Sequence, residues 1–401
     1  MNNSAKTVMI VAGEASGDAH GARLVEELKK LDSNIRFRGM GGDHLRQAGV
    51  DVLVDMAELS VMGITEVLAK YRLIRAELNR LKDEIRKQPP DLLILVDYQE
   101  FNQRLAAFAR SIGVKVLFYI GPSVWAWRPK RVYKMAKIVD HMAVILPFEK
   151  KLYEKANVPV TFTGHPLRDE VIRDKTPQQA RDKLALEERT TIGLFPGSRS
   201  GEIRRILPVL LDSAEIIRYE EKRNGKPDLQ FVLPIAPTIG NEDLAPYTEK
   251  LESLGVHCLK QNSSQAFYDI IQACDLALTA SGTATLEIGL LGVPMVIAHK
   301  ISPLSYFLLK RLVTTKFIGL VNIIPGKAVV REFLQNEATA ENISAEALRL
   351  LNDEKSYQNM QHELSLLGQQ LAGESDADEN KNPGNGSQNV AMLAYQMLND
   401  S

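Results

Sequence analysis

The stretch LLILVDYQEFN (residues 92–102) runs five aliphatic residues directly into Asp97 and places a second acid, Glu100, shortly after it. A continuous aliphatic run that ends at polar residues is typical of a strand buried on both faces of a parallel sheet. Two carboxylates after such a strand form a candidate acid/base pair, a structural cap or a solvated turn. The stretch therefore predicts a parallel sheet with chemistry at the carboxyl end of one strand.

Similar runs recur along the chain and alternate with helical patterns. In the first half they are TVMIVAG, IRFRGMGG, VKVLFYIG, HMAVILP and PVTFTG, and a second series begins at TIGLFPGSR. This alternation predicts an α/β fold of two Rossmann-like, doubly wound domains that face a cleft. We expect the domains at residues 1–170 and 191–345, a charged linker at 171–190, and C-terminal helices at 346–401. A Gly-, Asn- and Asp-rich insert at 373–389 is predicted to be a mobile loop.

Composition narrows the class of protein. The chain has 401 residues, of which 45% are hydrophobic and 25% charged, and its net charge is −1. The chain lacks the overall positive charge typical of nucleic-acid-binding proteins, so a nucleic-acid partner is not expected. The two cysteines are not part of a CxxC or His-rich pattern, so a metal site is not expected either. No stretch is long and apolar enough for a signal peptide or a membrane span, so a cytoplasmic protein is expected.

One basic amphipathic helix is predicted over residues 65–86, and it suggests contact with a membrane surface. Its candidate membrane-contact residues are Val67, Leu68, Tyr71, Ile74 and Leu78. The alternative is that this stripe is the core-facing side of a helix that covers the sheet.

Three glycine-bearing turns follow predicted strands and are candidate binding sites. The turn AGEASGD offers Glu14, Ser16 and Gly17; its acids suit a hydroxyl-rich ligand better than a pyrophosphate, and the alternative is a helix cap by Ser16 or Asp18. The turn FPGSRSGE offers Ser198 and Arg199 for an anion, or is simply a capped helix with a surface arginine. The turn ASGTATLE offers Ser281, Gly282 and Thr283 for phosphate, with Glu287 placed for ribose hydroxyls.

A fourth stretch, GPSVWAWRPKR, contains both tryptophans of the chain, Trp125 and Trp127, followed by Arg128. Aromatic planes beside arginines suit stacking on a sugar or lipid and holding a phosphate. The alternative is a pair of half-buried aromatics that anchor a loop.

Taken together, these motifs resemble the lipid-A-disaccharide synthase family of inverting GT-B glycosyltransferases. The resemblance extends from Val11 to about Gln335. The matching stretches are VAGEASGD, FRGMGG, LSVMGITEVL, GPSVWAWRPKR, TGHPL, FPGSR, SGTATLE, PMV, ISPLSYFLLKRL and VNIIPGKAVVREFLQ.

The resemblance implies transfer of 2,3-diacylglucosamine from UDP-2,3-diacylglucosamine to the 6-hydroxyl of 2,3-diacylglucosamine 1-phosphate, giving the β-1,6-linked lipid A disaccharide 1-phosphate and UDP. It implies no cofactor and no metal, a peripheral location on the cytoplasmic face of the inner membrane of a Gram-negative bacterium, and a possible homodimer through the C-terminal domain. UDP is expected in the second domain, where the resemblance alone adds Asn322 and Glu332 to its contacts, and the acceptor in the first.

The family resemblance is weakest at the two acids. Many members carry an Asp at the position of Glu100 and a proline before it, whereas this chain has Tyr98 and Gln99 in between. We expect Glu100 to be the general base and Asp97 to support it, although the two remain competing candidates. The alternatives are a UDP-sugar 2-epimerase, a GT-B transferase with a soluble acceptor, and a non-catalytic UDP-sugar or lipid-binding protein.

Overall fold

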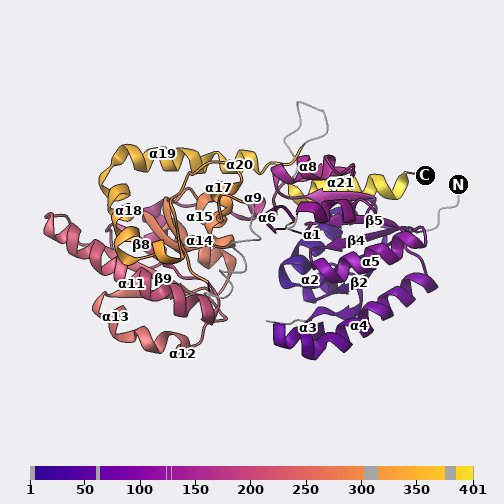
Figure 1. Cartoon of the computed structure of the whole chain (residues 1–401), viewed down its shortest axis with the longest axis horizontal. Helices are drawn as coiled ribbons and strands as arrows, with labels where there is room; N and C mark the ends of the chain where they lie inside the picture. Colours follow the sequence, from indigo (N-terminus) through magenta and orange to yellow (C-terminus); the bar gives the residue numbers. More distant parts are fainter. Residues whose placement is uncertain are drawn as a thin grey trace. The chain divides into compact units, whose positions relative to one another are not determined.

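The computed structural model describes residues 5–59, 64–122, 124–127, 129–301, 315–374 and 385–400, without the side chains of 64–70, 126, 127 and 129. The chain divides into two compact units. The first comprises Met1–Asp169 and Leu371–Ser401, and the second comprises Glu170–Gln370. Each unit is built on one parallel sheet, as the aliphatic runs predict (Figure 1).

The sheet of the first unit has seven strands in the order β3-β2-β1-β4-β5-β6-β7. The strands are β1 (Thr7–Ala12), β2 (Arg36–Gly41), β3 (Asp51–Asp55), β4 (Leu92–Val96), β5 (Lys115–Tyr119), β6 (His141–Val144) and β7 (Val160–Phe162). The described helices are α1 (Ala15–Leu31), α2 (Asp43–Gln47), α3 (Met56–Leu59), α4 (Ile64–Lys87), α5 (Gln99–Ser111), α6 (Val124–Trp127), α7 (Val132–Met135), α8 (Pro147–Glu154), α9 (Pro166–Glu170) and α21 (Gly386–Asn399). The chain changes winding direction between β1 and β4, so their carboxyl ends flank the switch point of the sheet.

Alternate residues of each central strand face opposite sides of this sheet, and helices cover both sides. Leu93 and Leu95 of β4 pack in one core with residues of α4 and α5. Leu92 and Ile94 pack in the other core with residues of α1 and α21. Coverage on both faces explains why the strands read as unbroken aliphatic runs.

The C-terminal helix α21 belongs to the first unit, and the prediction of one C-terminal segment at 346–401 is therefore wrong. Helix α21 packs against α1, β4 and β5, as its yellow ribbon beside the indigo and purple elements shows (Figure 1). Val390 and Leu398 are buried there, and burial of each such side chain stabilises the unit by about 1.5–3 kcal/mol. Residues 386–389 are helical rather than part of a loop, and residues 375–384 of the predicted insert lie outside the described residues.

The second unit has a six-stranded sheet in the order β10-β9-β8-β11-β12-β13, with its switch point between β8 and β11. The strands are β8 (Thr191–Phe195), β9 (Gln230–Ile235), β10 (Val256–Lys260), β11 (Leu276–Ala280), β12 (Met295–His299) and β13 (Glu332–Leu334). The described helices are α10 (Pro177–Lys183), α11 (Ser200–Arg223), α12 (Asn241–Leu244), α13 (Thr248–Ser253), α14 (Ser264–Gln272), α15 (Thr283–Leu290), α17 (Leu320–Ile323), α18 (Ala340–Asn352), α19 (Glu354–Ser365) and α20 (Leu367–Gln370).

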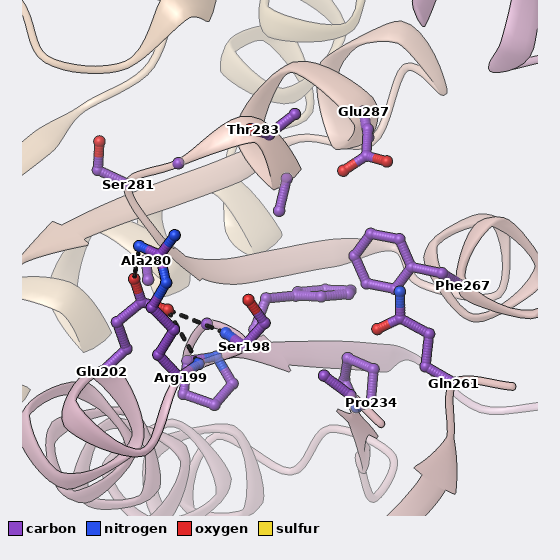
Figure 2. A pocket seen from close by; sticks show the side chains of 16 residues that line it. Ser198, Arg199, Glu202, Pro234, Gln261, Phe267, Ala280, Ser281, Thr283 and Glu287 are labelled. Atoms are coloured by element: carbon purple, nitrogen blue, oxygen red, sulfur yellow. Dashed lines mark hydrogen bonds and ion pairs between the residues drawn. The ribbon is translucent and has the colours of Figure 1, made fainter. Parts of the chain in front are cut away.

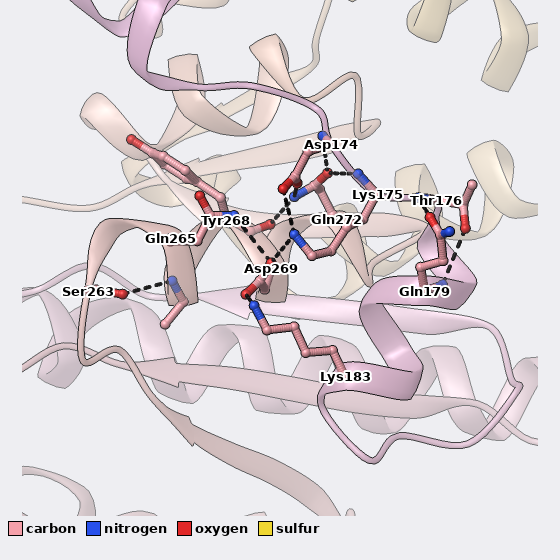
Figure 3. A network of polar contacts seen from close by, with 11 residues as sticks. Asp174, Lys175, Thr176, Gln179, Lys183, Ser263, Gln265, Tyr268, Asp269 and Gln272 are labelled. Carbon is pink, nitrogen blue, oxygen red and sulfur yellow. Dashed lines mark hydrogen bonds and ion pairs between the residues drawn. The ribbon is translucent and has the colours of Figure 1, made fainter.

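The segment predicted as a linker, 171–190, is fixed to the second unit by a polar network (Figure 3). Asp269 of α14 is buried and forms ion pairs with Lys175 and Lys183. Gln272 accepts hydrogen bonds from the main-chain N–H groups of Asp174 and Lys175. The charged composition of this segment reflects these contacts rather than a free linker.

Candidate functional site

A cavity of about 340 Å³ opens at the carboxyl ends of the strands that flank the switch point of the second unit. We call it the second-unit cavity. It brings together six residues that the sequence singled out: Ser198, Arg199, Ser281, Gly282, Thr283 and Glu287. Figure 2 shows the turn after β8 and the turn after β11 on neighbouring sides of this space. Ligands of open α/β sheets bind at this edge.

The two helix N-termini at the cavity differ in how their N–H groups are used. At α11, the Glu202 carboxylate accepts from the main-chain N–H groups of Ser198 (2.9 Å) and Arg199 (3.3 Å). This helix is therefore capped internally by Glu202, which agrees with the capped-helix alternative for this turn. The Arg199 side chain lies 3.7 Å from the Glu202 carboxylate and is 79% exposed, so it can also reach a ligand.

The N-terminus of α15 has no such internal cap. Its N-cap residue is Gly282, which has no side chain and makes no side-chain cap hydrogen bond. A Cβ atom at Gly282 would meet no other atom within 4 Å. The first N–H groups of a helix carry partial positive charge and bind anions, so this end of the cavity suits a phosphate.

Glu287 lies one turn into α15, partly buried against α14. Burial raises the pKa of its carboxyl to about 7, opposed by a hydrogen bond from Tyr268, while the charge of Glu170 raises it further. A carboxyl group held in this way can accept hydrogen bonds from a ligand hydroxyl once it is ionised.

Sequence reasoning missed the rest of the cavity wall, which is largely apolar: Phe195, Pro196, Gly197, Glu202, Pro234, Ala236, Gln261, Phe267, Ala280 and Ala284. The rings of Phe195 and Phe267 are 5.9 Å apart and nearly perpendicular. Several of these residues end a strand or directly follow one, and that position was the available sequence signal. Aromatic and aliphatic walls with a few polar groups are typical of small-molecule sites.

Asn322 and Glu332 do not line this cavity. The Asn322 amide is fully buried, donates to Glu332 (2.8 Å), and accepts from the N–H groups of Val329 and Val330. The two oxygens of Glu332 accept from the N–H groups that precede α17. The pair connects the loop around α17 to β13.

The switch point of the first unit carries the second group of candidate residues. Asp97 and Tyr98 follow β4 with φ angles of 49° and 45°, in the left-handed region that non-glycine residues rarely adopt. A Cβ atom at Gly13 would lie 2.3 Å from the Tyr98 ring, so only glycine allows that ring to pack on the end of β1. Strained backbone of this kind clusters at functional sites.

The two acids of the opening stretch have different environments. Asp97 is half-buried, and burial together with the charge of Glu14 raises the pKa of its carboxyl to about 6. Glu100 is 62% exposed and lies 3.3 Å from the Arg131 guanidinium. A pKa raised by burial suits a general base, so Asp97 fits this role better than the exposed Glu100.

The turn after β1 contributes Glu14 and Ser16, which are both exposed, and the buried Gly17. Glu14 is the N-cap residue of α1, without a side-chain cap hydrogen bond. Asp18 is buried and accepts from the N–H groups of Gly42, His44 and Leu45. Asp18 therefore caps α2, not α1, and Glu14 and Ser16 remain accessible at the switch point.

The sequence model of the lipid-A-disaccharide synthetase family matches residues 8–382. The chain belongs to this family. Among its relatives, the lipid-A-disaccharide synthase of Geobacter metallireducens is 46% identical over 394 residues, covering 98% of this chain and 97% of the relative. That of Nitrosococcus oceani is 45% identical over 372 residues, covering 92% and 94%. That of Coxiella burnetii is 38% identical over 400 residues, covering 98% and 99%.

Solved structures share the fold of this family member. The UDP-GlcNAc 2-epimerase of Neisseria meningitidis, solved bound to UDP-GlcNAc, has a TM-score of 0.60 at 14% identity and covers 98% of this chain and 99% of its own. MurG of Acinetobacter baumannii has a TM-score of 0.58 at 14% identity, with the same coverage. The two parallel-sheet units are the GT-B architecture.

The candidate membrane-contact residues of this family member fall into three groups. Leu78 is buried in the core of the first unit and Ile74 packs against it, so their assignment to a membrane is wrong. Tyr71 is 47% exposed. Val67 and Leu68 belong to α4, but their side chains lie outside the described residues. Within the described part of the chain, no helix is long and apolar enough to span a bilayer.

Two further candidates also lie outside the described residues: Arg128 and the side chain of Trp127. Trp125 is half-buried, and its ring meets Phe148 of α8 edge to face at 5.1 Å. No group of three or more His, Cys, Asp or Glu residues suited to a metal ion occurs among the residues that the structure describes.

Proposed function

We propose that this family member transfers 2,3-diacylglucosamine from UDP-2,3-diacylglucosamine to the 6-hydroxyl of 2,3-diacylglucosamine 1-phosphate, with inversion. The product is the β-1,6-linked lipid A disaccharide 1-phosphate, and UDP is released. The observation that carries this proposal is the pairing of two different switch-point sites in one family member. One site is suited to an anionic nucleotide, and the other contains a half-buried carboxyl group whose pKa is raised to about 6.

On the donor side, UDP occupies the second-unit cavity. Its diphosphate lies at the open N-terminus of α15, where Thr283 begins the helix, and Arg199 contributes a charge-assisted contact. Glu287 accepts hydrogen bonds from the ribose hydroxyls, and the apolar wall around Phe267 packs against the uracil. The arginine and the helix N–H groups stabilise the charge that develops on the departing diphosphate.

On the acceptor side, we assign the general base to Asp97, reversing the preference for Glu100 drawn from the motif. The carboxylate of Asp97 takes the proton of the acceptor 6-hydroxyl as that oxygen attacks the anomeric carbon of the donor. The bond between that carbon and the β-phosphate oxygen breaks, and its electron pair leaves with UDP. The half-buried position of Asp97 supports this role, whereas Glu100 is exposed and paired with Arg131.

The remaining residues at this edge bind the acceptor. Glu14, whose charge acts on Asp97, and Ser16 are both exposed and offer hydrogen bonds to sugar hydroxyls. Trp127 and Arg128 are proposed, from the motif alone, to stack on the acceptor and hold its 1-phosphate. Because both substrates carry acyl chains, we further propose that the protein works as a peripheral protein on the cytoplasmic face of the inner membrane, with Tyr71 at the surface. A homodimer through the C-terminal domain is also proposed.

The test is incubation of the purified protein with both lipid substrates in detergent, with UDP release and product mass followed together. The expected result is one disaccharide 1-phosphate per UDP, with a β linkage by NMR. UDP-GlcNAc alone and UDP-GlcNAc with a soluble sugar are the comparison reactions. Epimerisation of UDP-GlcNAc, or transfer to the soluble sugar without disaccharide formation, would overturn the proposal.

A further inference from the structure

Asn102, the last residue of the opening stretch, is a fully buried polar residue at the switch point of the first unit. It lies in α5 and its side chain has no exposed surface. Its amide nitrogen Nδ2 points to three main-chain carbonyl oxygens, at 2.8 Å from Asp97, 3.2 Å from Val96 and 3.5 Å from Val11. One amide group thereby joins the carboxyl ends of β1 and β4, the two strands that flank the switch point.

The strongest of these contacts is made to a strained residue. Asp97 and Tyr98 both have positive φ angles, and a non-glycine residue in a rare conformation costs on the order of 1–3 kcal/mol. Such a conformation persists only where surrounding contacts hold it. The Nδ2 contact at 2.8 Å holds the Asp97 carbonyl, and packing of Tyr98 on Gly13 holds the next residue.

An ordinary capping role does not explain this geometry. A side chain that caps a helix N-terminus accepts hydrogen bonds from the first N–H groups, whereas Asn102 donates. The first turn of α5 is closed by the main chain, from the Asn102 N–H group to the Tyr98 oxygen (3.1 Å). The acceptor Oδ1 of Asn102 is buried without a hydrogen-bond partner among the described residues. The hydrogen bonds of this side chain are therefore the ones that its Nδ2 group donates.

We propose that Asn102 is a positioning residue for the glycosyl transfer: its buried amide fixes the left-handed backbone at Asp97 and so holds the Asp97 carboxylate in place at the acceptor edge. The inference rests on the proposed function, because it requires Asp97 to be the base. A misplacement of about 1 Å at a catalytic group can lower the rate by about 10²-fold. Loss of the Asn102 donor should therefore reduce turnover and leave nucleotide binding, in the other unit, unchanged.

The test compares Asn102→Leu, which keeps the side-chain size and removes the donor, with the matched control Gln230→Leu. Gln230 is also buried and donates to the Glu187 carbonyl and to Thr191, but it lies at the amino end of a strand in the second unit. We expect Asn102→Leu to lower kcat by about 10²-fold, with KM for the UDP donor and Kd for UDP changed less than about 2-fold. Gln230→Leu should keep wild-type kcat.

A pH profile separates positioning from a general loss of stability. The charged and titratable groups around Asp97 are Glu14 and Tyr98, with Glu100 and Arg131 paired nearby. Wild-type kcat should rise with pH through about 6, because burial raises the pKa of Asp97. In Asn102→Leu the loosened turn admits water to Asp97 and lowers the pKa of its carboxyl. The rise of kcat with pH should therefore occur at lower pH than in wild type. If Asn102 had only a structural role, its substitution would reduce the fraction of folded protein at every pH. The pH at which kcat rises would then be the same as in wild type.

Two more variants keep the proposal testable if Asn102→Leu does not fold. Asn102→Ser retains a smaller donor and should have kcat between Asn102→Leu and wild type. Tyr98→Ala removes the ring that packs on Gly13, which is the second contact that holds this turn, so it should also lower kcat with UDP affinity unchanged. Wild-type kcat in Asn102→Leu, or a loss of kcat with an unchanged pH dependence, would overturn the positioning role. Failure of the proposed function is a separate outcome, since wild-type protein would then form no disaccharide.

Discussion

Glu149 is the buried acid whose ionisation should be visible as a dependence of stability on pH. It lies in α8, is 3% exposed, and accepts from the Leu146 N–H group at 3.2 Å. Burial raises the pKa of its carboxyl from 4.5 to about 8, against hydrogen bonds from Leu146 and Trp125. That difference corresponds to about 5 kcal/mol of stability lost once the group is ionised in the folded protein.

The direction of the pH dependence follows from the number of protons bound in the folded and unfolded states. Between pH 4.5 and about 8, the folded protein keeps the proton on Glu149 and the unfolded chain has lost it. The free energy of unfolding therefore falls as pH rises through this window and is highest below it. Glu149→Gln stays neutral and keeps an acceptor oxygen, so it removes this dependence. From pH 5.5 to 8, wild type should lose about 3 kcal/mol relative to Glu149→Gln.

The assay is urea unfolding followed by tryptophan fluorescence, because both tryptophans of the chain belong to the first unit. Other groups that titrate in this window cancel in the comparison with Glu149→Gln. Glu154→Gln is the control, since Glu154 lies on the same helix with its side chain 51% exposed. Parallel pH profiles for wild type and Glu149→Gln would refute the reasoning.

Three further predictions concern the two sites. Arg199→Ala should weaken UDP binding by about 10-fold in calorimetry, whereas Arg204→Ala, an exposed arginine of the same helix, should not. UDP affinity of wild type should rise as pH passes through about 7, as the Glu287 carboxyl ionises and becomes a better acceptor for the ribose, and Glu287→Gln should show no such rise. Gly13→Ala, whose Cβ would lie 2.3 Å from the Tyr98 ring, should lower kcat by at least about 10-fold with UDP affinity unchanged. The Arg199 assignment would be contradicted if Arg199→Ala and Arg204→Ala bound UDP equally well. The Glu287 assignment would be contradicted if the UDP affinities of wild type and Glu287→Gln changed equally with pH. Wild-type kcat in Gly13→Ala would contradict the assignment of the Tyr98 turn.

The fold was predictable because its strands are buried on both faces. Continuous aliphatic runs such as Leu92–Val96 are typical of strands in a sheet covered by helices on both sides, and the turns after them mark the binding edges. Helix α21 was not predictable in the same way. Its apolar face matches several possible partners, and only the tertiary packing against α1 decides which unit it covers.

The candidate sites were predicted in part, for a related reason. Residues that follow strands, such as Ser281 and Asp97, are placed by the topology. Hydrogen bonds that compete for the same groups are not visible in a motif. For that reason the capped form of α11 was only one of two alternatives, and the donor role of Asn102 was missed. The environments that distinguish Asp97 from Glu100 likewise depend on burial and on a distant arginine.

The most direct test of this account is the turnover of Asp97→Asn and Glu100→Gln, measured as UDP release with both lipid substrates saturating. Asp97 is half-buried with a pKa raised to about 6, and Glu100 is exposed and paired with Arg131. We therefore predict that Asp97→Asn loses about 10²–10⁴-fold in kcat and that Glu100→Gln stays within about 5-fold of wild type. Near wild-type turnover in Asp97→Asn together with an inactive Glu100→Gln would contradict the account.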